Sequence, residues 1–209
     1  MTRDEIAAIY LAAGRSRRFG KNKLHQPLGK NGSLGSFALR TALQSSLDRV
    51  IVVTNTTDRL NWIPNDWLST YQGKWVHVAC KDAGKGQSYS LKCGLHYAGK
   101  FHMKAAMVLL ADQPFISTRM INQLIEQHRQ NPDLLFVAAT FSGITRPPIL
   151  FTSSIFPKLF QLQGDQGARQ LLQHESAKGR FVHFSDPWAF FDVDTTADYQ
   201  IIKDCTMHM

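Results

Sequence analysis

The sequence has few cysteines and no long apolar run. Cys80, Cys93 and Cys205 are widely spaced, with no CxxC pair and no histidine at metal-ligand spacing beside them. The apolar run of residues 6–13 is too short for a membrane span, and the acidic residues before it are atypical of a signal peptide. These absences argue against a disulfide-stapled or membrane-bound protein and predict a cytoplasmic one.

The eight histidines form no HExxH pair, and no internal repeat or low-complexity linker is present. Of the 209 residues, 44% are hydrophobic and 19% are charged, which is the usual composition of a folded globular protein. The length suits one domain with a large core. We therefore expect a single domain over residues 1–209.

The formal net charge of +8 is concentrated in one short segment. Residues 14–23 contain no acid and contribute five cations, more than half of the net charge: Arg15, Arg17, Arg18, Lys21 and Lys23. No recognised nucleic-acid motif or long basic stripe accompanies them. A focused charge of this kind favours a small polyanion as ligand and disfavours DNA or RNA as partner.

Apolar, β-rich runs alternate with segments of helical spacing through the first two thirds of the chain. The predicted strands are residues 6–13, 50–54, 75–80, 105–110 and 135–140, and the predicted helices are residues 36–46, 88–98 and 118–130. Several strands are apolar on both faces, which is typical of a parallel sheet covered by helices. The pattern predicts an α/β fold.

The last third of the chain is less regular. Pro147 and Pro148 predict an edge strand that runs to Phe151, and a polar loop at residues 164–167 precedes a short predicted helix. Residues 190–195 are predicted to form a final strand. It would pass into a helix in which Thr195 and Asp198 have the spacing of a capping box.

The segment after the first strand is suited to phosphate binding. In doubly wound sheets ligands sit beyond the carboxyl ends of strands, and here glycines permit close backbone approach while cations neutralise charge. Phe19 stands where a Walker A loop needs glycine, and Lys21 is followed by Asn22, so this is not a P-loop. The alternative is a solvated basic turn.

Residues 11–23, LAAGRSRRFGKNK, resemble the LAAGxSxRxGxxK signature of the MobA-like nucleotidyltransferases. The resemblance implies a three-layer α/β/α fold with a mostly parallel, Rossmann-like sheet of the nucleotide-diphospho-sugar transferase type. It implies that the loop wraps the triphosphate of a nucleotide and that Arg18 and Lys23 touch phosphates. The implied nucleotide-binding positions in this segment are Leu11, Ala12, Ala13, Gly14, Arg15, Ser16, Arg18 and Lys23; Arg15 and Arg17 are expected to point partly to solvent.

Asp112 follows a buried strand and is the best candidate metal ligand. Magnesium prefers one or two carboxylates together with substrate phosphates, and a strand-end aspartate beside the loop supplies the first. The segment 111–114 resembles the ADQP motif of the family's cytidylyl branch, which implies a catalytic Mg²⁺ at Asp112. The alternative is that Asp112 only turns the chain before Pro114.

Asp192 and Asp194 alternate along the predicted final strand and would then share a face, where they could complete the metal shell. Residues 192–195, DVDT, resemble the family's DIDTPED segment, although residues 196 and 197 depart from its proline and glutamate. Ordinary capping of the strand end is the alternative.

Three later segments resemble family motifs and supply candidate acceptor ligands. Ser88 and Ser90 lie in a GxSxSL-like segment, where Ser88 could contact nucleotide or acceptor or could simply cap a helix. Arg146, in an RxxPxLF-like strand, and Arg169, in a GDxGAR-like loop, could hold an acceptor phosphate bidentately. Surface or capping roles remain open for both arginines.

Two features bear on the substrates. Ala13 stands where guanylyl enzymes of the family have a second glycine, which favours CTP. Residues 33–42 resemble versions found in xanthine dehydrogenase accessory proteins, which favours a molybdopterin acceptor and a molybdenum hydroxylase as client. The expected reaction is CMP transfer from CTP to the terminal phosphate of molybdopterin. The alternatives are GTP as donor, a sugar or polyol phosphate as acceptor, and a non-catalytic chaperone that inserts the cofactor.

Overall fold

A seven-stranded sheet forms the centre of the protein. The computed structural model describes residues 5–14, 16, 18–20, 22–30, 32–165, 171–172 and 175–206. The strand order is β5-β4-β1-β6-β8-β7-β9, and all neighbours are parallel except those of β8. The strands are β1 Ile6–Leu11, β4 Arg49–Asn55, β5 Trp75–Cys80, β6 Ala105–Leu110, β7 Phe136–Phe141, β8 Ile144–Thr152 and β9 Gly179–His183.

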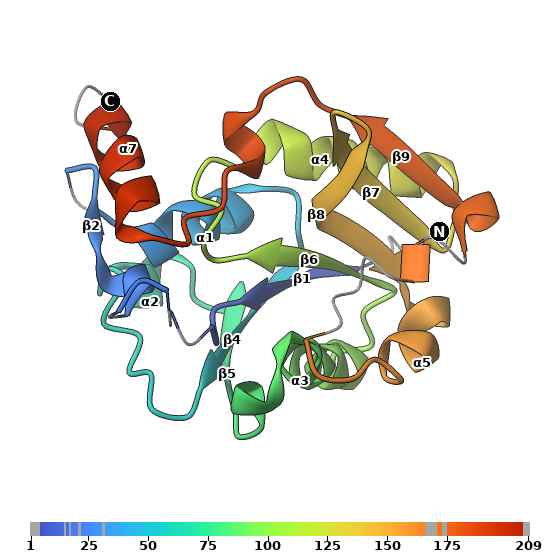
Figure 1. Cartoon of the computed structure of the whole chain (residues 1–209). Helices are drawn as coiled ribbons and strands as arrows, with labels where there is room; N and C mark the ends of the chain where they lie inside the picture. Colours follow the sequence, from blue (N-terminus) through green and yellow to red (C-terminus); the bar gives the residue numbers. More distant parts are fainter. Residues whose placement is uncertain are drawn as a thin grey trace.

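Helices cover both faces of this sheet, which confirms the predicted three-layer α/β/α architecture (Figure 1). The helices α1, Leu34–Gln44, and α4, Thr118–Gln130, pack on one face, and α3, Gln87–Lys100, and α5, Phe156–Leu159, pack on the other. The remaining elements are short or peripheral: η1 Lys23–His25, β2 Pro27–Leu28, β3 Gly32–Ser33, α2 Trp67–Thr70, η2 Ala83–Lys85, η3 Ser153–Ile155, η4 Ser176–Lys178, η5 Trp188–Phe190 and α7 Thr196–Thr206.

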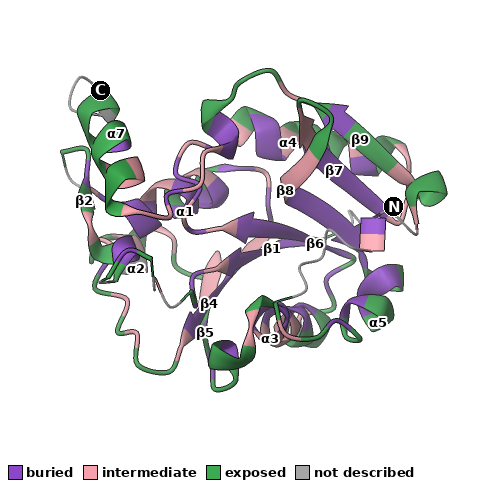
Figure 2. Cartoon of the chain, in the orientation of Figure 1, coloured by how far each residue is buried: buried purple, intermediate pink, exposed green. Residues whose placement is uncertain are grey.

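The central strands are apolar on both faces because each face belongs to a different core (Figure 2). Along β1, Ile6, Ala8 and Tyr10 pack with α1 and α4, while Ala7 and Ile9 pack with α3 and α5. All five residues are fully buried. The five predicted strands match observed ones to within two residues at each end, and in β1, β4 and β6 this two-sided burial accounts for the continuous apolar run that predicts the strand.

The prediction that residues 147–151 form an edge strand is wrong. Strand β8 is longer and lies inside the sheet, antiparallel to both β6 and β7. Its register with β7 shifts between Ala138, paired with Ile149, and Ala139, paired with Arg146. The two prolines are the extra residues of this bulge, so their missing N–H groups remove no ladder hydrogen bond.

The predicted final strand over residues 190–195 is also absent. The 3-10 helix η5 ends at Phe190, and residues 191–194 pair with no strand among the described residues. The predicted capping box is confirmed, because Thr195 Oγ1 accepts from the Asp198 N–H at 3.2 Å and Asp198 Oδ2 accepts from the Thr195 N–H at 2.7 Å. Of the short helix expected after the 164–167 loop, only residues 171 and 172 are described, and both are helical.

No helix in the described part of the chain has both the length and the apolar character that crossing a bilayer requires.

Candidate active site at the carboxyl ends of β1 and β6

The loop after β1 and the segment after β6 meet because these two strands are neighbours. Leu11 and Leu110 are paired in register, and the strands run parallel, so both chains leave the sheet at the same edge. A cavity of about 450 Å³ lies there, within the range of small-ligand pockets. It is lined by Leu11, Ala12, Ala13, Gly14, Ser16, Arg18, Lys23, Leu24, Ala83, Gly84, Lys85, Gly86, Gln87, Ser90, Leu110, Ala111, Asp112, Asp165 and Asp194.

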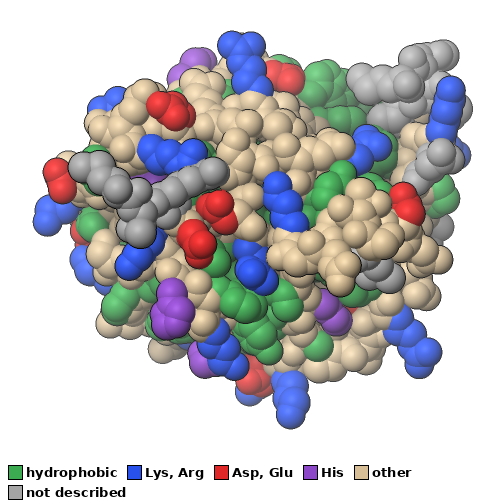
Figure 3. Space-filling model, turned by 180° about the vertical axis from the view of Figure 1, so that it is seen from behind, with side chains coloured by type: hydrophobic (Ala, Val, Ile, Leu, Met, Phe, Trp, Pro, Cys, Tyr) green, Lys and Arg blue, Asp and Glu red, His purple; other side chains and the backbone are tan. Residues whose placement is uncertain are grey.

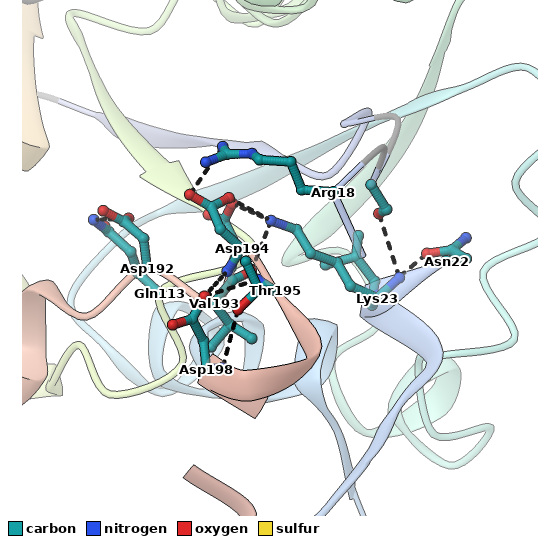
Figure 4. A network of polar contacts seen from close by, with 12 residues as sticks. Arg18, Asn22, Lys23, Gln113, Asp192, Val193, Asp194, Thr195 and Asp198 are labelled. Atoms are coloured by element: carbon teal, nitrogen blue, oxygen red, sulfur yellow. Dashed lines mark hydrogen bonds and ion pairs between the residues drawn. The ribbon is translucent and has the colours of Figure 1, made fainter. Parts of the chain in front are cut away.

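The ammonium of Lys23 is surrounded by three oxygen atoms. Lys23 Nζ lies 2.7 Å from Asp112 Oδ2, 2.8 Å from the carbonyl oxygen of Val193 and 3.3 Å from Asp194 Oδ1 (Figure 4). Only 9% of the Lys23 side chain is exposed. Three segments far apart in the sequence therefore converge on one buried cation.

Local hydrogen bonds hold Lys23 in this position. The Asn22 side chain accepts from the Leu24 N–H at 3.2 Å and thereby caps the short helix η1. Ser16, whose φ is 48°, accepts from the Lys23 N–H through its hydroxyl at 3.3 Å. Hydrogen bonds within the loop therefore hold Lys23 in place without a ligand.

Arg18 is the exposed partner of the same cluster. Its guanidinium lies 2.9 Å from Asp194 Oδ2, and 72% of its side chain is exposed. The neighbouring Phe19 is buried and packs edge-on against Tyr199 of α7, which anchors the loop. Arg18 is therefore attached to a fixed backbone but remains able to reach a ligand in the cavity.

Asp112 is fixed by the chain on both sides. Its carbonyl oxygen accepts from the Val193 N–H at 3.0 Å, and the following Gln113 N–H bonds to the Leu110 carbonyl at 3.3 Å. No described residue donates to Asp112 Oδ1, so this oxygen is available to a ligand of the cavity.

Asp192 and Asp194 do not share one environment, contrary to the expectation drawn from strand alternation. Asp194 lines the cavity and contacts Arg18 and Lys23. Asp192 Oδ1 accepts from Gln113 Nε2 at 2.8 Å, and its Oδ2 lies 3.3 Å from Arg146 Nη1. Without a final strand to fix their alternation, the two carboxylates take different partners.

Burial and the nearby negative charge of Asp112 raise the pKa of Asp192, and the hydrogen bond from Gln113 and the charge of Arg146 oppose that shift only in part. Gln113 itself is 2% exposed, and its Oε1 has no partner among the described residues. Asp192 is thus a partly desolvated carboxylate held by two donors beside the cavity.

The predicted acceptor residues have mixed positions. Ser90 lines the cavity. Ser88 does not: it is fully buried, and its hydroxyl donates to the Gly164 carbonyl at 2.8 Å. Arg146 contacts Asp192 outside the cavity lining, and Arg15 and Arg169 lie outside the described residues.

Sequence reasoning places the GxSxSL-like segment along the ligand cleft but names only Ser88 and Ser90 in it as candidate ligands. Gly84, Lys85 and Gln87 line the cavity just before or at the start of α3, and Asp165 lines it from the loop that meets that helix. The Gln87 N–H lies 3.4 Å from Asp165 Oδ1. The glycine turn before the helix was the signal for the first three, whereas nothing in the sequence linked residue 165 to residue 87.

The oxygen atoms around Lys23 are the ones that could hold a metal. Asp112 and Asp194 both reach one ammonium, whereas Asp192 is engaged elsewhere. Within the described ranges no group of three or more His, Cys, Asp and Glu side chains is arranged to hold a metal ion. A magnesium ion here would therefore take two carboxylates and complete its shell with phosphate and water oxygens.

Comparison with known proteins agrees with this geometry. The model of the MobA-like NTP transferase domain matches residues 8–179. The chain belongs to this family. The purine catabolism protein PucB of Bacillus subtilis (strain 168) is 37% identical over 201 residues, which cover 95% of this chain and 96% of the relative. The chain is thus a nucleotidyltransferase of the MobA-like type, related to PucB.

Solved structures share the fold. Rv0371c from Mycobacterium tuberculosis H37Rv superposes with a TM-score of 0.76 at 22% identity, covering 98% of this chain and 100% of that one. A 4-diphosphocytidyl-2C-methyl-D-erythritol synthase from Anaerococcus prevotii DSM 20548 gives a TM-score of 0.75 at 16% identity, covering 97% and 96%. At these identities the likeness concerns the fold alone.

The surface charge agrees with a focused site. On the face shown in Figure 3, Lys and Arg side chains are scattered among acidic and uncharged ones. Among the described residues of the 14–23 loop, the cations Lys23 and Arg18 are paired with carboxylates. This arrangement suits a ligand that brings its own phosphates and metal.

Proposed function

We propose that the protein transfers CMP from CTP to the terminal phosphate of a molybdopterin acceptor, with release of pyrophosphate and with Mg²⁺ as cofactor. The observation that carries the proposal is the convergence of Lys23, Arg18, Asp112 and Asp194 at the edge of one cavity. A triphosphate needs cations, its metal needs carboxylates, and both are available there.

The residues present fit a magnesium ion. Two carboxylates and one carbonyl group surround the positive charge at Lys23 Nζ. All three are oxygen ligands of the kind that Mg²⁺ prefers. When bound, the ion would neutralise charge on the reacting phosphates. Asp112 and Asp194 would hold it, while Lys23 and Arg18 would turn from these carboxylates toward the phosphates.

Positioning and charge would then carry the catalysis. An acceptor phosphate is already ionised near neutral pH, so no side-chain base is required. Lys23 and Arg18 would offset the repulsion between the two anionic substrates and stabilise the leaving pyrophosphate. Losing one such preorganised contact lowers a rate by roughly 100-fold or more.

The substrates are proposed on separate grounds. Ala13 favours CTP and lines the cavity beside Gly14, so a base bound there would meet its side chain. The acceptor is proposed from the relation to a purine catabolism protein, and the client would then be a molybdenum hydroxylase such as xanthine dehydrogenase. The three cysteines form no disulfide, which suits the reducing cytoplasm.

Pyrophosphate release tests the proposal. The protein would be incubated with Mg²⁺, molybdopterin and each nucleoside triphosphate in turn, and we expect release with CTP. Release with GTP alone would overturn only the base assignment. No release with any triphosphate would overturn the transfer reaction for this acceptor.

A second candidate acceptor is a sugar or polyol phosphate, because a solved structure of the same fold is named as a 4-diphosphocytidyl-methylerythritol synthase. A panel of phosphorylated acceptors with CTP separates the two. A chaperone that only inserts the finished cofactor would instead bind it stably without turnover of any donor.

A further inference from the structure

Two cysteines meet beside the cavity. Cys80 is the last residue of β5 and is buried, and Cys93 lies half-buried in the middle of α3. Their Sγ atoms are 2.6 Å apart, with Cys93 donating to Cys80, while the third cysteine, Cys205, is exposed. Two thiols in contact on neighbouring elements can be linked as a disulfide with little movement of either side chain.

The segment between the two cysteines forms one wall of the cavity. It contains η2 and the first turns of α3, and six of its residues line the cavity: Ala83, Gly84, Lys85, Gly86, Gln87 and Ser90. The backbone of Gly86 packs closely against that of Gly164, because a Cβ at Gly86 would lie 2.3 Å from the Gly164 backbone. The φ of Gly86 is 130°, a conformation that favours glycine. A covalent link between Cys80 and Cys93 would tie the two ends of this segment together and restrict its movement.

We propose that Cys80 and Cys93 are a reversible thiol–disulfide site whose oxidation locks the β5–α3 wall of the cavity. The oxidising partner is a small-molecule disulfide of the glutathione type. The proposal rests on the geometry of the two thiols alone and does not depend on which nucleotide or acceptor the cavity binds.

The chemistry proceeds by two exchanges. Cys93, the more accessible thiol, attacks the disulfide of the oxidant as a thiolate and releases one small thiol. Cys80 then attacks the Cys93 sulfur, expels the second small thiol and completes the protein disulfide. Overall two protein thiols are oxidised by two electrons, one small disulfide is reduced, and the two protons pass to the released thiols.

The environment sets the speed of this reaction. Burial, together with the neighbouring Cys80, raises the pKa of the Cys93 thiol to about 12, so little thiolate exists at neutral pH. The first exchange should accordingly be slow near pH 7. Its rate should rise about tenfold for each pH unit up to about pH 9.

The experiment uses the full chain with Cys205→Ser, which removes the exposed thiol and with it links between molecules. The protein is equilibrated with oxidised and reduced glutathione at several pH values between about 7 and 9. Trapped samples are analysed by intact mass, by non-reducing peptide mapping and by thermal unfolding. We expect a mass loss of about 2 Da, a linked peptide pair containing residues 80 and 93, and a rise in Tm of about 5 °C.

Cys93→Ala in the same background should show no link and no change in Tm under the oxidant. Three results would overturn the proposal: both thiols still alkylated after denaturation of the oxidised sample, glutathione retained on Cys93 without closure, or a linked form that melts below the reduced one. An equal rise in Tm in Cys93→Ala would also overturn it.

Discussion

Asp194 and Asp192 are two residues apart, yet their carboxylates belong to different clusters. Asp194 joins Lys23, Arg18 and Asp112 at the cavity, while Asp192 is held by Gln113 and Arg146 beside it. In the first cluster the carboxylates are paired with cations that could instead bind the phosphates of a ligand. In the second cluster burial raises the pKa of Asp192. The comparison teaches that the partners of a carboxylate, rather than its place in a motif, decide what it can do.

The sharpest test of this difference is the pair Asp112→Asn and Asp192→Asn. Asp112→Asn should lower kcat by about 100-fold or more, because it removes the carboxylate that faces Lys23 and that we propose holds Mg²⁺. Asp192→Asn should retain the wild-type kcat at saturating acceptor. Steady-state pyrophosphate release measures both rates, and circular dichroism checks that both variants fold. Equal rates in the two variants would contradict the claim that only the cluster around Lys23 takes part in catalysis.

Lys23→Met removes the buried ammonium but keeps much of its side-chain volume. CTP affinity measured by calorimetry with Mg²⁺ should fall by about 10- to 100-fold, since a direct charged contact to phosphate is lost. Lys100→Met, at the exposed end of α3, is the matched control and should bind CTP as the wild type does. Undiminished binding by Lys23→Met would remove the residue from the site.

The two arginines should show opposite effects. Arg18→Met should weaken CTP binding by about tenfold and change the free energy of unfolding little, because 72% of its side chain is exposed. Arg146→Met should leave CTP binding unchanged but destabilise the fold by about 1–2 kcal/mol, because Asp192 loses its cation. Calorimetry and urea unfolding separate these outcomes. A loss of CTP affinity in Arg146→Met would show that the Asp192 cluster also takes part in nucleotide binding.

The smallest effect is on the pH dependence of stability. The hydrogen bonds from Thr195 and Asp194 lower the pKa of Asp198 despite its desolvation, so its stabilising contribution is present above the unfolded pKa and is lost as pH falls through the folded one. The pKa of Asp192 is raised, so the fold binds that proton more tightly and loses stability as pH rises between the unfolded and folded values.

Urea unfolding of the wild type, Asp192→Asn and Asp198→Asn at about pH 3 and pH 7 measures these contributions. Relative to the wild type, Asp192→Asn should gain stability as pH rises, and Asp198→Asn should lose it. The same sign of change in both variants would contradict the assignment of the two carboxyl groups.

The sequence predicts the first two thirds of the fold well because most of the strands there are apolar on both faces and the segments between them have helical spacing. It also predicts that the loop of residues 14–23 and Asp112 lie close together, since adjacent parallel strands bring the two segments to the same edge of the sheet. The contact between Lys23 and Asp112 follows from this topology, although the residues are 89 positions apart.

What could not be predicted depends on contacts between distant segments. The place of β8 depends on a bulge opposite Ala138 and Ala139. Ser88 was assigned to ligand binding because its motif resembles one that lines a cleft, but in the fold its hydroxyl meets Gly164. The pairing of Cys80 with Cys93 likewise needs a helix to pack against a strand at one particular register.

The most direct test is a crystal structure of the protein with CTP and Mn²⁺, which replaces Mg²⁺ and is visible by anomalous scattering. We expect the triphosphate on the loop of residues 14–23, and an anomalous peak at a metal–oxygen distance of about 2.1 Å from the Asp112 carboxylate. A triphosphate bound away from this loop, or a metal ion that does not contact Asp112, would contradict it.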